Sequence, residues 1–152
     1  MHPFKHKTPI QLRFKDGDVM GHVNNANHLT YIELARIKYF EDVVGSDASW
    51  SQQQGIILAH ISIDYKQPLY IRDQVFVYTR CSKLGKKSIE LSWVIVREKA
   101  NVGTQNLASL QETVAQGIAV LVCYDYTENK AIEIPIAQRT KIELFEGNSL
   151  AM

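Results

Sequence analysis

The sequence predicts an α+β fold in which one long helix packs on an antiparallel sheet. One stretch, from about Asn27 to Val44, repeats apolar residues every three to four positions, as an amphipathic helix does. Three later stretches alternate apolar and polar residues, as half-buried strands do, and a fourth is very apolar. The chain has 152 residues, of which 45% are hydrophobic, so we expect a single domain over 1–152 with its core at about 8–147.

The first part of the chain is expected to form a strand, a loop and the long helix. Residues 1–8 are expected to be a loose leader, and Ile10–Phe14 alternates as a short strand. The polar stretch Lys15–Asn27 is then a loop, rich in glycine and asparagine. The N-cap candidates are Asn24, Asn25 and Asn27, and Gly45 stands where a helix-ending glycine belongs. The expected apolar stripe consists of Leu29, Ile32, Leu34, Ala35, Tyr39, Phe40, Val43 and Val44.

The second part is expected to be a run of hairpins followed by a short helix. Three alternating runs are Ile61–Lys66, Val75–Cys81 and Ile89–Ile95, and a fourth, very apolar strand is expected at Val114–Tyr126. A polar stretch, Lys99–Gln111, is predicted to be a long connection. Pro135 suits the first turn of a terminal helix that ends near Glu146, with Gly147 as its stop and 147–152 as a tail.

Composition excludes several classes of function. The 17 basic and 16 acidic residues give a net charge of +1, so a basic nucleic-acid-binding surface is not expected. Two cysteines are too few for a disulfide framework, and no Cys/His spacing typical of a metal site occurs. The longest apolar stretch, Val114–Tyr124, is too short for a membrane span, and the N-terminus does not resemble a signal peptide. A cytoplasmic protein without metal or cofactor is expected.

The segment from Asp16 to Arg36 carries the most specific motif, D-x-D-x-M-G-H-V-N-N-A-x-x-L-x-Y-x-E-x-A-R. It resembles the 4-hydroxybenzoyl-CoA thioesterase-like branch of the hotdog-fold acyl-CoA thioesterases. Weaker similarities follow at Ile63–Pro68, Leu84–Leu91, Val114–Gly117 and Ile134–Pro135, so that the resemblance covers roughly residues 8–147. It implies a hotdog fold, an antiparallel sheet wrapped around one long central helix with a short C-terminal helix. It also implies pairing into homodimers or homotetramers.

The resemblance implies that Asp18 is the catalytic carboxylate, acting as nucleophile or as general base on water. The backbone N–H of Asn25 falls where the family polarises the thioester carbonyl. Elementary chemistry agrees, because a carboxylate just before a helix start lies beside unpaired N–H groups at the positive end of the helix dipole. An aspartate between two glycines is, however, also a common turn residue.

Other residues of the motif and of the strands are candidates for substrate binding. His22 is a candidate for proton transfer or for orienting the loop, since imidazole titrates near neutral pH. Asp16 is expected to hold the loop, and His28 to be a packing residue. The substrate-binding candidates are His22, Asn24, Asn27, Lys66, Lys87 and Ser88, the two lysines as partners for CoA phosphates.

Three functions fit the motif, and acyl-CoA thioesterase is the one that it favours. An acyl carrier protein is the alternative carrier of the acyl group. A non-catalytic acyl-CoA-binding hotdog protein would not need Asp18. A hotdog enoyl-CoA hydratase or dehydratase would need an Asp and a His five residues apart in a D-x-N-P-x-H pattern, whereas Asp18 and His22 are four apart.

Overall fold

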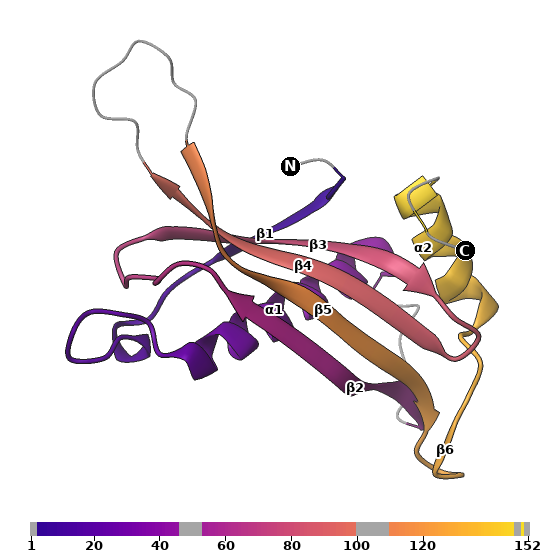
Figure 1. Ribbon diagram of the computed structural model, residues 1–152. Helices are drawn as coiled ribbons and strands as arrows, with labels where there is room; N and C mark the ends of the chain where they lie inside the picture. The colour runs from indigo at the N-terminus through magenta and orange to yellow at the C-terminus, as the bar shows by residue number, and fades with distance from the viewer. Residues whose placement is uncertain (1–2, 46–52, 100–109, 148–149, 151–152) are drawn as a thin grey trace.

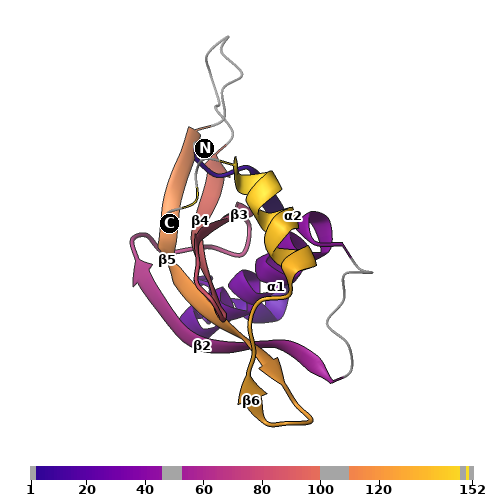
Figure 2. The same cartoon turned by 90° about the vertical axis from the view of Figure 1, so that its right-hand side faces the viewer.

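The computed structural model describes residues 3–45, 53–99, 110–147 and 150. They form a curved antiparallel sheet with a long helix lying along its concave face (Figure 1, Figure 2). The order of the main strands is β1-β3-β4-β5-β2, and the short β6 pairs with β5. The strands are β1 (His6–Ile10), β2 (Gln54–Tyr65), β3 (Gln74–Leu84), β4 (Ser88–Lys99), β5 (Leu110–Asp125) and β6 (Lys130–Ala131).

The helix α1 (Asn25–Val43) begins at an asparagine cap, as the sequence predicted. The side chain of Asn24 accepts a hydrogen bond from the backbone N–H of Ala26 at 3.0 Å. Gly45 follows the helix with a φ of 90°, which a glycine adopts without steric cost. The C-terminal helix α2 (Ile136–Glu146) has Pro135 as its N-cap, one residue before the first turn in which we expected it.

Two apolar clusters between α1 and the sheet make the core. The first surrounds Tyr31, Ile32 and Ala35, and the second surrounds Tyr39 and Phe40. Leu29 and Leu34, which the sequence placed in the apolar stripe, are instead 43% and 42% exposed. The helix therefore has a second apolar face that the rest of the described chain does not cover.

The first strand lies earlier in the chain than predicted. His6, Thr8 and Ile10 point inward and pair with β3, so residues from His6 onward are not a loose leader. Pro9 is tolerated because β1 is an edge strand, where a missing N–H costs no ladder bond. The expected strand Ile10–Phe14 gives way to a 3₁₀ turn, η1 (Phe14–Asp16), because the Asp16 carboxylate accepts hydrogen bonds from the Arg13 backbone and guanidinium.

The other strands are confirmed but are longer than their alternating cores. β4 runs to Lys99 and β5 begins at Leu110, so most of the predicted connection, residues 100–109, lies outside the described residues. The sequence reading missed β6, which is only two residues long. Within the described ranges, neither helix is long and apolar enough to cross a membrane.

Candidate active site

The loop before α1 is built on Asp16, which is only 1% exposed. Its Oδ2 accepts hydrogen bonds from the backbone N–H of Arg13 at 3.0 Å and from the hydroxyl of Tyr31 at 2.7 Å. Burial opposes ionisation of this carboxyl, but the hydrogen bonds from Arg13 and Tyr31 outweigh it and hold its pKa below the usual aspartate value. Asp16 therefore ties the loop to the helix as an anion, the holding role that the sequence assigned to it.

Asp18 lies at the exposed tip of this loop. Its Oδ1 accepts hydrogen bonds from the backbone N–H groups of Met20 at 2.8 Å and His22 at 3.1 Å. Its backbone N–H donates to the carbonyl of His22 at 2.7 Å, and Gly21 turns the chain with a φ of 78°. The turn fixes one carboxylate oxygen, while Oδ2 accepts no hydrogen bond from the described residues. A carboxylate held in this way has one oxygen available to a substrate or a water molecule.

The asparagines at the start of α1 have different roles: some cap the helix or order the loop, and one lies at the exposed helix end. Asn24 caps the helix, and its backbone N–H donates to the carbonyl of Asp16 at 2.9 Å. Asn27 donates from its side chain to the same carbonyl at 3.1 Å. The Asn25 N–H, in the first turn, has no intrahelical acceptor and none among the other described residues. Asn24 and Asn27 thus order the loop, whereas Asn25 presents an unpaired donor.

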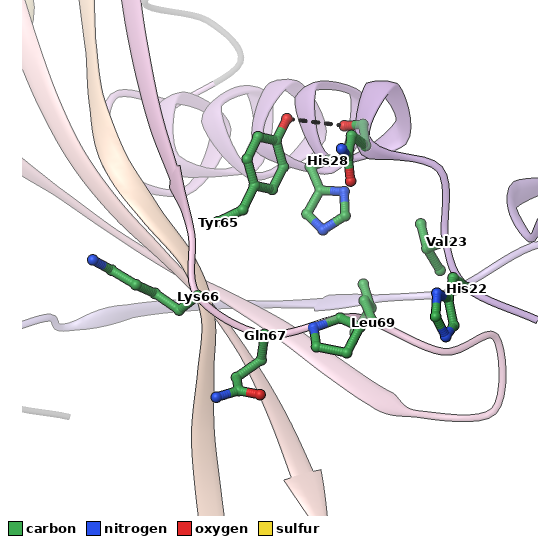
Figure 3. Close-up of a pocket in the computed structure, with 9 residues that line it drawn as sticks. His22, Val23, His28, Tyr65, Lys66, Gln67 and Leu69 are labelled. Carbon is green, nitrogen blue, oxygen red and sulfur yellow. Dashed lines mark hydrogen bonds between the residues drawn. The ribbon is translucent and has the colours of Figure 1, made fainter.

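A cleft of about 270 Å³ opens beside this helix end (Figure 3). It lies between α1 and the segment that follows β2. The backbone N–H of Val23 donates to the carbonyl of Leu69 at 2.7 Å and joins the two walls. The hydroxyl of Tyr65 donates to the carbonyl of Asn25 at 3.3 Å, the dashed line in Figure 3. The lining residues are His22, Val23, Asn25, His28, Tyr65, Lys66, Gln67, Pro68 and Leu69.

His22 stands at the mouth of the cleft. Its ring meets that of Tyr70 edge to face, with centroids 4.8 Å apart, and the two residues also form an isolated β-bridge. These contacts orient the imidazole from a second segment of the chain. The contacts with Tyr70 fit the loop-orienting alternative for His22, and the residue also lines the cleft.

The predicted site residues divide into two groups. The structure brings Asp18, His22, Asn24, Asn25, Asn27 and Lys66 to one end of the molecule. Lys87 and Ser88 lie on the turn between β3 and β4, at the other end of the strands (Figure 1). A single chain does not place these two residues beside the cleft.

The sequence reading gave His28 and Tyr31 no functional weight, although both belong to the site. Tyr31 donates a hydrogen bond to Asp16, and His28 projects from α1 into the cleft (Figure 3). The signal that could have found them is helical spacing, because His28 lies three and Tyr31 six residues after Asn25 on neighbouring faces of one helix. Among the described residues, no group of three or more His, Cys, Asp or Glu side chains is arranged to hold a metal ion.

Comparisons with known proteins show what this chain is similar to. The profile of the thioesterase-like superfamily matches residues 12–142. The chain is 29% identical over 140 residues to the long-chain acyl-CoA thioesterase FadM of Escherichia coli K12, covering 90% of this chain and 96% of that protein.

Solved structures of thioesterases have the same fold. A thioesterase from Thermus thermophilus, determined in complex with coenzyme A and zinc, superposes with a TM-score of 0.78 at 31% identity, over 99% of this chain and all of that one. The PA2801 protein of Pseudomonas aeruginosa, a putative thioesterase, gives a TM-score of 0.74 at 27% identity, over 91% and 98% of the two chains.

Proposed function

The chain belongs to the thioesterase-like superfamily, and on that premise we propose that it is an acyl-CoA thioesterase with Asp18 as its catalytic carboxylate. Family membership and the hotdog fold confirm the resemblance that the D-x-D motif indicated. The observation that carries the assignment to Asp18 is its geometry. Asp18 is an exposed carboxylate with one hydrogen-bonded oxygen, on the loop that leads into a helix N-terminus with an unpaired N–H.

The proposed reaction uses both groups. The Asn25 N–H donates to the thioester carbonyl and stabilises the negative charge that develops on its oxygen, assisted by the helix dipole. Asp18 either attacks the carbonyl carbon to form an anhydride, or removes a proton from the water that attacks. In both routes the C–S bond breaks, CoA leaves as the thiol after protonation, and one water is consumed to give the free acid. Transfer of ¹⁸O from labelled water to Asp18 after a single turnover would identify the anhydride route.

The phosphate-binding role of Lys87 requires a second subunit. Lys66 lies at the cleft of its own chain, but Lys87 and Ser88 lie at the far end of the sheet. A two-fold pairing in which the two subunits run antiparallel would bring the turn between β3 and β4 of one subunit beside the cleft of the other. We therefore assign Lys87 and Ser88 to the cleft of a neighbouring copy.

Uncovered apolar surface supports this self-association. Leu34 and Ile37 on α1 are 42% and 46% exposed, and Leu58 on the edge strand β2 is 46% exposed. Exposed apolar side chains and an unpaired strand edge favour association. Sedimentation equilibrium should give about two or four times the 17.3 kDa chain mass; a stable monomer would contradict the pairing.

A panel of thioesters tests the proposed activity. Wild-type protein is given acyl-CoAs of increasing chain length, an aromatic acyl-CoA and an acyl-acyl carrier protein, and free thiol is followed with time. We expect thiol release from at least one acyl-CoA. Tight binding without release would favour the non-catalytic alternative, and addition of water to crotonyl-CoA without release would favour the hydratase.

A further inference from the structure

His28 is a buried polar side chain inside the substrate cleft. It is only 2% exposed and projects from α1 toward the opposite wall of the cleft, where Leu69 lies (Figure 3). The ring lies against Tyr65 edge to face, with centroids 5.2 Å apart, and 6.2 Å from the ring centroid of Tyr31. Two aromatic side chains therefore fix the imidazole in place.

The imidazole has unused hydrogen-bonding capacity. Its Nδ1 is buried, and no group among the described residues meets it in full hydrogen-bonding geometry, although the Asn24 and Asn25 carbonyls lie near the ring. Burial lowers the pKa of His28 below the ordinary histidine value, although the nearby carbonyls of Asn24 and Asn25 act in the opposite direction. The ring is therefore neutral near pH 7, with one nitrogen as donor and the other as acceptor.

The surroundings of the ring make an unsatisfied hydrogen-bonding group unfavourable. The neighbouring parts of the cleft are apolar, since Val23 and Leu69 are buried and Pro68 lies between β2 and Leu69. A buried polar atom without a partner loses the hydrogen bond that water would give it. An unsubstituted hydrocarbon chain in this cleft would leave the imidazole unpaired, whereas a ligand oxygen would satisfy it.

The position of His28 limits where that oxygen sits in the ligand. His28 is three residues after Asn25, which corresponds to a rise of about 4.5 Å along the helix. Under the proposed function, the thioester carbonyl lies at the Asn25 N–H. A ligand oxygen that reaches His28 is therefore only a few bonds away from that carbonyl.

We propose that His28 is a specificity-determining residue that selects acyl groups with a hydrogen-bonding oxygen near the thioester, namely 3-hydroxyacyl or 3-oxoacyl-CoA. The proposal rests on the proposed function and deepens it by naming the class of acyl group. Sites that hydrogen-bond a substrate hydroxyl discriminate strongly against the analogue that lacks it, because the protein group is then left unpaired.

The test compares kcat/KM for 3-hydroxydecanoyl-CoA and decanoyl-CoA. Wild-type protein should prefer the hydroxylated substrate by about tenfold or more. In His28→Phe this ratio should fall to about one, through loss on the hydroxylated substrate, whereas His28→Gln should keep part of the preference. The control is His6→Gln, because His6 is also buried with an unbonded Nδ1 but lies on β1 beside Asp42. It should leave the ratio unchanged.

Two results would overturn the proposal. One is equal kcat/KM for the two substrates in wild-type protein. The other is an equal loss on both substrates in His28→Phe, which would place the contact on the pantetheine arm or make it structural. If wild-type protein released thiol from neither substrate and from no other acyl-CoA of the panel, the proposed function would fail. The Kd values of the two thioesters, measured by calorimetry for wild type and His28→Phe, would then decide the selectivity by the same comparison.

Discussion

Two buried tyrosines hold two buried carboxylates, one at the site and one far from it. Tyr31 donates to Asp16 at 2.7 Å, and Tyr39 donates to Glu146 at 2.6 Å. Both carboxylates are 1% exposed. The first pair joins α1 to the loop that carries Asp18, and the second joins α1 to the end of α2. The pairs are therefore chemically matched but differ in distance from the cleft.

Removing each hydroxyl in turn distinguishes an effect on stability from an effect on catalysis. We expect both Tyr31→Phe and Tyr39→Phe to lower the free energy of unfolding by about 1–2 kcal/mol, since each leaves a buried carboxylate oxygen short of a donor. Only Tyr31→Phe should also lower kcat, because it loosens the loop that carries Asp18. Urea unfolding and thiol release measure the two effects. An equal loss of kcat in the two variants would contradict this role of Asp16 and Tyr31.

His28 also makes stability depend on pH. Its pKa is lowered by burial in the folded protein, so below about pH 6.5 the unfolded chain takes up a proton that the folded chain resists. Tyr31, Tyr65, His22 and Lys66 are the titratable groups in contact with the ring or lining its cleft. Asp16, whose pKa is lowered, loses its contribution only in more acidic solution.

Stability should therefore fall as pH falls from 7.5 to 5.5, and part of this fall should be absent in His28→Phe. The comparison uses urea midpoints of wild type and variant at both pH values, so that the other histidines contribute to both proteins alike. An identical pH dependence in the two proteins would show that His28 is not held in its neutral form.

At the scale of elements, the pairing of β2 with β5 depends on a close approach at Gly117. A Cβ at this position would lie 1.9 Å from the backbone oxygen of Ser62 and 2.7 Å from the ring of Trp93. Gly117→Ala should lower the free energy of unfolding by about 3 kcal/mol, because the obstructing atoms belong to a paired strand and a buried ring. Denaturant unfolding checks this value.

The matched control is Gly85→Ala on the turn between β3 and β4. There the added Cβ would meet the Ser88 side chain, whose hydroxyl can rotate away. We expect a loss of less than about 1 kcal/mol. Equal losses in the two variants would mean that the close approach at Gly117 does not limit the sheet.

The helices and central strands were predictable because their signals are local. Helical periodicity, an asparagine cap and Gly45 bounded α1 to within two residues. The edge strand β1 was misplaced because Ile10, Leu12 and Phe14 alternate as apolar residues, whereas His6 and Thr8, which point inward from β1, are polar. What ends the strand is the Asp16 side chain bonding back to Arg13, a contact that periodicity does not report.

At the scale of the whole molecule, the D-x-D motif predicted the end of the fold at which the cleft lies. It did not predict the cleft's opposite wall, because Tyr65 and Leu69 come from a distant part of the chain. The sequence also did not predict that Lys87 and Ser88 lie far from the cleft, because their position depends on how the strands are arranged in the sheet. The exposed Leu29 and Leu34 were predicted as core because apolar spacing alone does not distinguish a side chain packed on the sheet from one on an exposed face of the helix.

The central claim is that the Asp18 carboxylate performs the chemistry, and a matched pair of variants tests it. Asp125 also accepts two backbone hydrogen bonds through Oδ1, from Thr127 and Glu128, but it lies at the far end of β5 (Figure 1). Asp18→Asn and Asp125→Asn therefore disturb similar turns. The measurement is the rate of thiol release at saturating concentration of the best acyl-CoA. The rate of the Asp18→Asn variant should be about 100-fold or more below that of wild type, whereas the rate of Asp125→Asn should stay near wild type. Similar rates in both variants would contradict the assignment.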